Sequence, residues 1–179
     1  MNVFKRLLGD DAYKNLPQAV QDYHNHIHSH FSGTAFSGGA KNPIANTVRK
    51  LFGFPALADT VSVSIELDIH NGRDRWQRNF GGRRFSSSFF PNPDGTLDER
   101  FSPFRFRFRV RRQENKMYWD FVGWSLGPVP LPKILGPRIV TWETASSEGG
   151  FEFYSHADFP VIGRLVHYHG IVFPVEMGM

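Results

Sequence analysis

The sequence of 179 residues contains no cysteine, which excludes disulfide bonds and thiolate metal sites and fits a reducing compartment. It also lacks any apolar run near the roughly 18 residues of a membrane-spanning helix. The apolar stretch within residues 1–13 is too short for a signal peptide. We therefore expect a cytoplasmic protein. The net charge of +4 is mild for this length and is weak evidence for an anionic partner.

Several motifs of common enzyme classes are missing as well. There is no GxSxG elbow, no P-loop, no GxGxxG fingerprint and no cysteine nucleophile. The sequence therefore predicts no cofactor and identifies no catalytic residue.

Phenylalanine, by contrast, is abundant, with 18 residues in the chain. This abundance favours strands or an aromatic-lined cavity over a helical bundle. The length predicts one domain over residues 1–179, with a mostly helical cap segment over 1–58 and an antiparallel barrel over 59–175.

The cap segment shows helical spacing twice. Before residue 28, four apolar residues recur every three or four positions and predict a helix: Leu16, Val20, Tyr23 and Ile27. A short strand is expected at 30–37. Residues 42–55 predict a second helix, in which one face carries Ile44, Val48, Leu51 and Phe52.

From Thr60 onward the apolar pattern has a period of two, which indicates strands. The expected strands are 60–70, 73–80, 83–90, 96–101, 104–113, 116–126, 138–145, 150–157 and 164–173. Most connections have hairpin length, so neighbouring strands should be antiparallel. We predict a mainly β protein, an up-and-down, lipocalin-like (calycin-like) barrel of about nine or ten strands capped by one or two helices. A half-open sheet wrapped on the helices is the alternative.

Two tight turns predict where Arg78 points. A two-residue turn at Asn71-Gly72 places Ile65 opposite Arg78 and Leu67 opposite Trp76, so Arg78 lies on the apolar face. A second turn at Gly81-Gly82 then pairs two more residues with this strand: Phe85 with Arg78, and Ser87 with Trp76.

A buried arginine is costly without a partner, and the next strand offers one. Glu99 shares a strand face with Leu97 and Phe101, so it should point inward. We predict an interior Arg78–Glu99 pair. It is either a structural ion pair that fixes strand register or, together with Trp76 and Ser87, part of a cavity that holds the polar end of a ligand.

The stretch "FRFRFRVRR" alternates from Phe104 to Arg112. Phe106 and Phe108 should face the cavity, while the arginines face outward. A tight turn at Glu114-Asn115 would put Asp120 opposite Arg109 and Trp124 opposite Arg105. Such a surface resembles nucleic-acid or anionic-membrane contact sites, but a solvated outer face is favoured over nucleic acid.

The sequence leaves open the orientation and the partners of several histidines, of Tyr168 and of Glu143. The four histidines of "YHNHIHSHF" include His24, which we expect to reach the core with a partner; metal binding by the cluster stays open. Either His167 and His169 or Tyr168 faces the lumen. An inward Tyr168 hydroxyl would need a polar partner. Glu143 is a second candidate inward carboxylate.

The segments "WQRNFGGRRF", "LDERFSP", "PLP" and "FPVIGRLVHYHG" resemble a bacterial family known as domain of unknown function 4166. That resemblance implies that members occur alone or behind NAD-binding domains of the saccharopine-dehydrogenase or epimerase type, which makes such a reductase or epimerase domain a candidate functional partner. Ser102 and Ile171 depart from the family pattern. The positions that match it are His24, Gly33, Trp76, Arg78, Phe80, Gly81, Gly82, Glu99, Arg100, Pro130, Pro132, Glu143, Pro160, Gly163, Tyr168 and Gly170.

These observations favour a module that binds a small apolar or amphipathic, lipid-like molecule. The expected ligand-binding residues are Trp76, Arg78, Phe85, Ser87, Glu99, Phe106, Phe108, Glu143 and Tyr168. One alternative is an enzyme with Glu99 or Glu143 as acid or base, or one that partners an NAD-dependent oxidoreductase. Another is a structural or interaction domain without a ligand.

Overall fold

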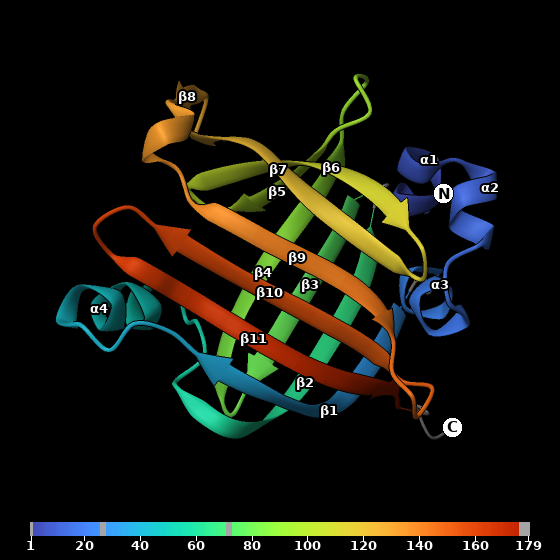
Figure 1. Ribbon diagram of the computed structural model, residues 1–179, viewed down its shortest axis with the longest axis horizontal. Coiled ribbons are helices and arrows are strands. Elements are labelled where there is room, and N and C mark those ends of the chain that lie inside the picture. Colours follow the sequence, from blue (N-terminus) through green and yellow to red (C-terminus); the bar gives the residue numbers. More distant parts are fainter. Residues whose placement is uncertain (1, 26–27, 71–72, 176–179) are drawn as a thin grey trace.

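The chain forms a closed antiparallel barrel in a computed structural model that describes residues 2–25, 28–70 and 73–175 (Figure 1). Its strands are β1 (His28–Gly38), β2 (Ala58–His70), β3 (Arg73–Phe80), β4 (Arg83–Pro91), β5 (Leu97–Phe101), β6 (Phe104–Gln113), β7 (Lys116–Leu126), β8 (Val129–Leu131), β9 (Arg138–Ala145), β10 (Phe151–Phe159) and β11 (Gly163–Pro174). The predicted strands from residue 60 onward agree with these bounds to within two residues at each end.

Around the barrel the strands follow their order in the sequence, except that β8 lies outside the ring. The order is β6-β5-β4-β3-β2-β1-β11-β10-β9-β7-β8, and β6 also pairs with β7 to close the ring. The short β8 is an extra strand beside β7 within a segment we had expected to be only a loop. Closure leaves the ten strands of the ring without a free edge, and the expected barrel is confirmed.

Strand β1 joins the two ends of the meander by pairing with both β2 and β11. Two glycines allow this close approach. A Cβ on Gly33 would collide with the backbone carbonyl of Ile171, and one on Gly170 would meet Ala35, Phe153 and the Thr34 carbonyl. The expected short strand at 30–37 is therefore part of the barrel wall.

Three short helices form the N-terminal segment that the sequence predicts to be helical. They are α1 (Val3–Leu8), α2 (Asp10–Lys14) and α3 (Gln18–Asn25). Gly9 separates α1 from α2. Its φ of 80° is not helical, and glycine adopts this backbone conformation more readily than other residues do. Pro17 precedes α3, and β1 is already extended from His28. The start of the main helix at Pro17 agrees with the prediction, but the predicted helix does not extend to residue 28.

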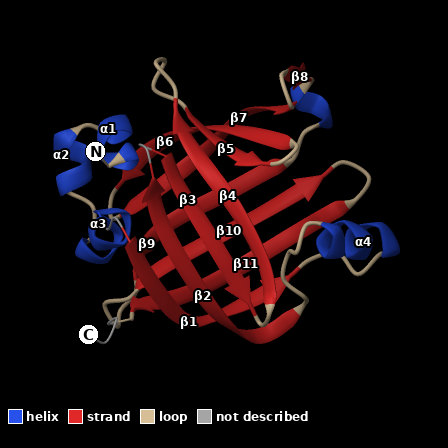
Figure 2. Ribbon diagram, turned by 180° about the vertical axis from the view of Figure 1, so that it is seen from behind, coloured by secondary structure: helices blue, strands red, loops and turns tan. Residues whose placement is uncertain are grey.

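The helices α1–α3 close one end of the barrel (Figure 2). Phe4 and Val20 are fully buried, and Tyr23 stacks on Phe151 at 3.7 Å between ring centroids. Phe4 also contacts Trp76 and Trp119 of the barrel interior. This end is a packed aromatic core.

The opposite end carries α4 (Pro43–Leu51), β8 and the 3-10 helix η1 (Lys133–Leu135). The apolar face predicted for this helix is only partly buried, with Val48 and Phe52 half-buried. Ile44 and Leu51 are exposed, while Ala45 and Arg49 are buried. Arg49 explains the difference, since its guanidinium donates to the carbonyls of Leu165 and Ala40 at 2.9 and 2.6 Å and turns that side of α4 toward the barrel.

A β-bulge corrects a second prediction. The register between β6 and β7 shifts between Arg107 and Phe108, so Trp124 lies opposite Phe106 rather than Arg105. The shift moves Trp124 from the outer to the inner face, where its ring stacks with Phe104. The predicted pairing of Arg109 with Asp120, which lies between the β6–β7 turn and the bulge, is confirmed.

No helix in the described part of the chain is long and apolar enough to cross a membrane.

Candidate functional site

The register that directs Arg78 inward is the predicted one. Arg78 lies opposite Ile65 on β2 and Phe85 on β4, and Trp76 lies opposite Leu67 and Ser87. Residues 71–72 of the first turn lie outside the described residues, but the strands on both sides of it align as a two-residue turn requires. The Arg78 side chain is only 10% exposed.

Arg78 is held by contacts on several sides. Its Nη1 donates to Ser87 Oγ at 3.0 Å, and its Nη2 lies 3.6 Å from Glu99 Oε1. The guanidinium carbon is 4.9 Å from the ring centroid of Trp76 and 5.4 Å from that of Phe85. The predicted interior Arg78–Glu99 pair is present, at a distance longer than that of a close ion pair.

Burial dominates the ionisation of Glu99. Desolvation raises the pKa of this carboxyl, although Arg78 and Ser87 act in the opposite direction. Glu99 therefore keeps its proton to a higher pH than a surface glutamate does.

Tyr168 faces the lumen, and His167 and His169 face outward. Burial raises the pKa of the Tyr168 hydroxyl, while Arg78 and a hydrogen bond to Ser155 act in the opposite direction. Ser155 in turn shares a 2.8 Å hydrogen bond with Thr141. Outside the barrel, His169 lies 2.7 Å from Glu152.

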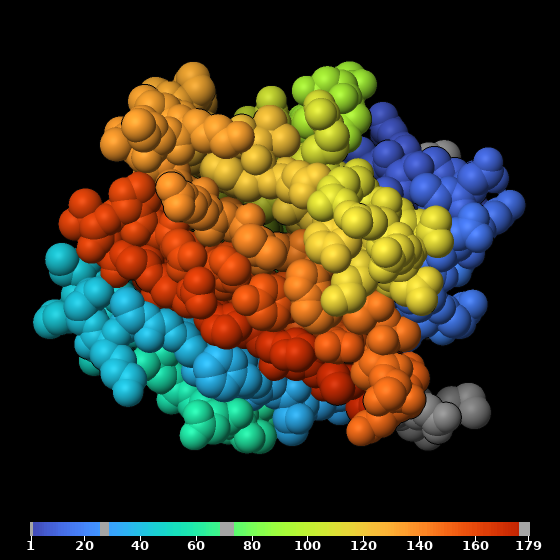
Figure 3. Space-filling model, viewed as in Figure 1, coloured from blue at the N-terminus to red at the C-terminus, as the bar shows by residue number. Residues whose placement is uncertain are grey.

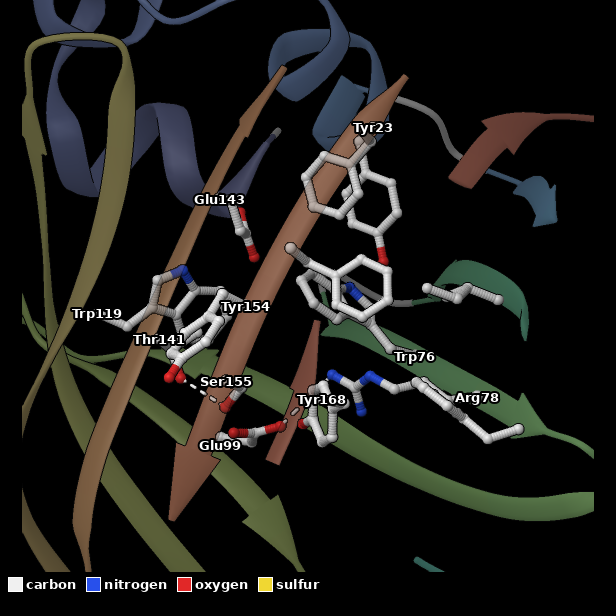
Figure 4. Close-up of a pocket in the computed structure, with 14 residues that line it drawn as sticks. Tyr23, Trp76, Arg78, Glu99, Trp119, Thr141, Glu143, Tyr154, Ser155 and Tyr168 are labelled. Carbon is white, nitrogen blue, oxygen red and sulfur yellow. Dashed lines mark hydrogen bonds and ion pairs between the residues drawn. The ribbon is translucent and has the colours of Figure 1, made fainter. Parts of the chain in front are cut away.

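Five side chains thus gather across the lumen, as Figure 4 shows. They come from both halves of the sequence, and we call them the polar belt: Arg78, Glu99, Thr141, Ser155 and Tyr168.

The polar belt separates two cavities. The mouth cavity, of about 420 Å³, lies toward α4 and η1 and is lined mainly by aromatic and aliphatic groups: Val48, Phe52, Phe54, Phe101, Phe104, Phe106, Phe108, Trp124, Leu135, Pro137, Ile139, Ala157, Phe159, Pro160, Ile162, Leu165 and Val166. The inner cavity, of about 60 Å³, lies toward α3 and is lined by Tyr23, Trp76, Trp119 and Glu143 among others. Glu99, Thr141, Ser155 and Tyr168 line both.

A second buried acid–base contact lies beyond the inner cavity. His24 Nε2 is 2.7 Å from Glu143 Oε2, and both side chains are almost fully buried. The expectation that His24 reaches the core with a partner is confirmed, and Glu143 faces inward as proposed. Nearby, the buried Trp119 Nε1 has no hydrogen-bond partner among the described residues.

Most of the predicted site residues line one of these cavities. Trp76, Arg78 and Glu143 line the inner one, Phe106 and Phe108 the mouth cavity, and Glu99 and Tyr168 both. The remaining two, Ser87 and Phe85, contact Arg78 but are outside the described lining of both cavities.

Sequence reasoning missed Thr141 and Ser155. Both carried a usable signal, because Thr141 alternates in phase with Glu143, and Ser155 alternates in phase with Phe151 and Phe153. Tyr23 and Trp119 also line the inner cavity. Tyr23 had been assigned only to a core-facing helix.

Among the four clustered histidines, His24 reaches the interior, and the alternating arginines of β6 lie on the outer face of the barrel. Residues 26 and 27 lie outside the described residues, as does the side chain of His28. The rest of the described chain contains no group of three or more His, Asp or Glu side chains placed to hold a metal ion. Outside the barrel, Arg107 binds Asp98 at 2.7 Å, and Asp120 binds Arg111 at 2.6 Å rather than its cross-strand neighbour Arg109.

Comparison with known families gives one match. The family model described as Domain of unknown function (DUF4166) matches residues 16–172, which include the entire polar belt and the His24–Glu143 pair. The chain belongs to this family. No curated protein matches the chain significantly. For this DUF4166 member, the Phe-rich barrel is compatible with a binding module, and the family description assigns no reaction.

Proposed function

We propose that the protein binds a single amphipathic, lipid-like molecule inside the barrel. The apolar part of the ligand occupies the mouth cavity, and its polar group lies against the polar belt. The observation that carries this proposal is that four belt residues line both cavities, so an apolar chamber ends at a set of hydrogen-bonding groups. Ligand pockets commonly combine an apolar lining with a few such groups.

The size and lining of the mouth cavity support an apolar occupant. Its volume of about 420 Å³ falls within the range of small-molecule sites, roughly 300–1,000 Å³. Phe106, Phe108 and their aromatic neighbours offer surface on which hydrocarbon is favourably buried.

The buried guanidinium of Arg78 favours a ligand with an anionic or strongly polar head group. Its contact with Glu99 is 3.6 Å long, so a better acceptor could displace that carboxyl. A planar guanidinium suits a carboxylate or phosphate, to which it can donate two hydrogen bonds. The raised pKa of Glu99 fits this role, because a protonated Glu99 leaves the arginine charge for the ligand.

The proposal is tested with the fluorescent fatty acid cis-parinaric acid, with oleic acid and oleyl alcohol as competitors. Arg78→Met should weaken binding of oleic acid about tenfold or more, the effect of losing a charge-assisted hydrogen bond. It should change binding of uncharged oleyl alcohol much less. Arg75→Met is the matched control, because Arg75 lies on the same strand with an exposed side chain.

Absence of parinarate binding by the folded wild type, together with no lipid in an organic extract of the purified protein, would show the proposal to be wrong. An equal effect of Arg78→Met on the acid and the alcohol would retain the cavity but remove the assigned role of Arg78. Intact folding and unchanged retention in an Arg78→Met/Glu99→Met variant would identify the pair as a structural register device.

Acid–base catalysis is the second candidate, and the raised pKa of Glu99 favours it. A buried glutamate that titrates near neutrality could transfer a proton to or from a bound ligand. Titration of the carboxyl groups by NMR distinguishes the two: a Glu99 that is fully ionised well below neutrality would remove this candidate.

A further inference from the structure

The rim of the mouth cavity is apolar and exposed. Three segments far apart in the sequence contribute to it, and all lie at one end of the barrel, at the left of Figures 1 and 3: α4, the β8–η1 segment and the loop between β10 and β11. Their exposed apolar residues are Ile44, Leu51, Val129, Ile134, Leu135 and Val161. We call this set the mouth rim. Leu51, Ile134 and Val161 are 77%, 84% and 98% exposed.

Part of the apolar surface of α4 faces outward, unlike that of an ordinary surface helix. Arg49 is 3% exposed and is anchored to the backbone of the barrel, whereas Leu51 and Ile44 point to the outside. Surface helices of proteins in water normally turn their apolar side to the core. The buried arginine therefore holds α4 so that Ile44 and Leu51 face outward, while Val48 faces the mouth cavity.

The mouth rim is continuous with the cavity. Val48 and Phe52 from the α4 segment line the mouth cavity, as do Leu135 of η1 and Ile162 of the β10–β11 loop. An apolar molecule that enters at the rim would thus contact apolar side chains along the whole path to the polar belt.

Charge is distributed unevenly between the two ends of the barrel. At the mouth end, the segments between the wall strands (residues 39–57, 81–82, 102–103, 127–137 and 160–162) contain no Asp or Glu. They do contain Lys41, Lys50 and Lys133, in addition to the buried Arg49. The connecting segments at the helix-capped end carry all of the following acids: Asp10, Asp11, Asp22, Asp94, Glu114 and Glu148.

We propose that the mouth rim docks on an anionic lipid bilayer and that the ligand of the barrel enters or leaves through this contact. The second half of this inference rests on the proposed function. Apolar side chains surrounded by lysines fit the interface of a bilayer, where the former enter the acyl boundary and the latter meet anionic head groups. The connecting segments at this end carry no carboxylates, which lowers repulsion from that surface. The strand ends there carry Asp59 and Asp158, and Asp158 is paired with Arg164 at 2.7 Å.

Flotation of the purified protein with vesicles tests the docking. The wild type should bind vesicles of phosphatidylglycerol mixed with phosphatidylcholine, and it should bind phosphatidylcholine alone much less. Leu51→Glu/Ile134→Glu should lower the bound fraction at least about tenfold, because two apolar contacts become anionic. Val122→Glu is the matched control on the side wall, where Val122 is also exposed.

The lysines are tested separately. Lys50→Glu should reduce binding to the anionic vesicles about fivefold or more and should increase its sensitivity to salt. Lys14→Glu is the matched control, because Lys14 is exposed on α2 at the opposite end. Equal losses from Lys50→Glu and Lys14→Glu would overturn the assignment of this end.

Parinarate binding in solution, measured on the same variants, separates this inference from the proposed function. If the wild type binds parinarate but does not float with anionic vesicles, docking is wrong and the binding function stands. If it floats but binds no parinarate, docking stands without a role in ligand transfer. A dimer that the rim substitutions dissociate, with no vesicle binding, would assign the rim to a second copy and overturn the proposal.

Discussion

His24 on α3 and Glu143 on β9 share a hydrogen bond of 2.7 Å inside the closed end of the barrel, although they lie 119 positions apart in the sequence. The bond connects the helical cap to the barrel wall. Phe4 packs on the His24 ring at 4.0 Å between centroids, so the contact is shielded from water. Three aromatic rings of the core, those of Tyr23, Trp76 and Phe151, also lie against it.

Removing either partner of this contact should destabilise the protein. His24→Leu or Glu143→Leu alone is expected to lower the free energy of unfolding by about 3 kcal/mol, because the remaining polar group is buried without its partner. The double variant should lose less than the sum of the two, by about 1–3 kcal/mol. Urea denaturation of all four proteins measures this coupling, and strictly additive losses would contradict it.

Asp74 should make the stability depend on pH. Its carboxyl is buried, Oδ1 has no hydrogen-bond partner among the described residues, and desolvation raises its pKa. The folded state therefore binds more protons than the unfolded chain above the ordinary aspartate pKa, so stability falls there as pH rises, by at most about 1.4 kcal/mol per pH unit.

Asp74→Asn removes this titration. The variant should be more stable than the wild type near neutral pH, and the difference should shrink as pH falls toward about 4, below which aspartate is protonated in both states. Chemical denaturation at a series of pH values measures it. Asp59→Asn, at an exposed position, is the control. A difference that does not vary with pH would rule out a titrating Asp74.

Buried tyrosines should make the barrel sensitive to alkali. Burial raises the pKa of both the Tyr23 and the Tyr168 hydroxyl. Above about pH 10 the unfolded chain loses these protons while the folded state keeps them, so stability should fall as pH rises. Tyr168→Phe should lessen the slope of stability against pH in this range, whatever it does at neutral pH. An unchanged slope would show that Tyr168 ionises as freely in the folded protein as in the unfolded chain.

Gly33 should be intolerant of any side chain. A Cβ there meets the Ile171 backbone across the β1–β11 pairing, so Gly33→Ala should lower the free energy of unfolding by about 2 kcal/mol or more. Gly123→Ala is the matched control on another wall strand, because nothing lies within 4 Å of its Cβ position. Thermal denaturation compares the two, and similar melting temperatures would contradict the close approach of β1 and β11.

Local sequence signals predicted the barrel strands and the inward position of Arg78 and Glu99. Glycine turns of two residues leave one register for a hairpin, and alternation then determines which face each residue occupies. Arg78, Phe85 and Ser87 are consequently placed where the register requires.

Three features depended on long-range structure and could not be read locally. Trp124 lies on the inner face instead of the predicted outer face because a bulge adds one residue to β7. No turn motif in the sequence indicates this bulge. The side of α4 that faces the barrel depends on the carbonyls that Arg49 reaches in β11 and before α4. The partner of His24 became identifiable only when β9 was placed next to β7 and beneath α3.

The pairing of β1 with β11 has a consequence for synthesis on the ribosome. The nascent chain can form the β2–β7 hairpins in order as they emerge, but β1 has only one of its two neighbours until the final strand has left the exit tunnel. Until then one flank of β1, including Gly33, presents unpaired amide and carbonyl groups to other chains. A translation stop just before Gly163 should therefore yield a species prone to strand-mediated aggregation.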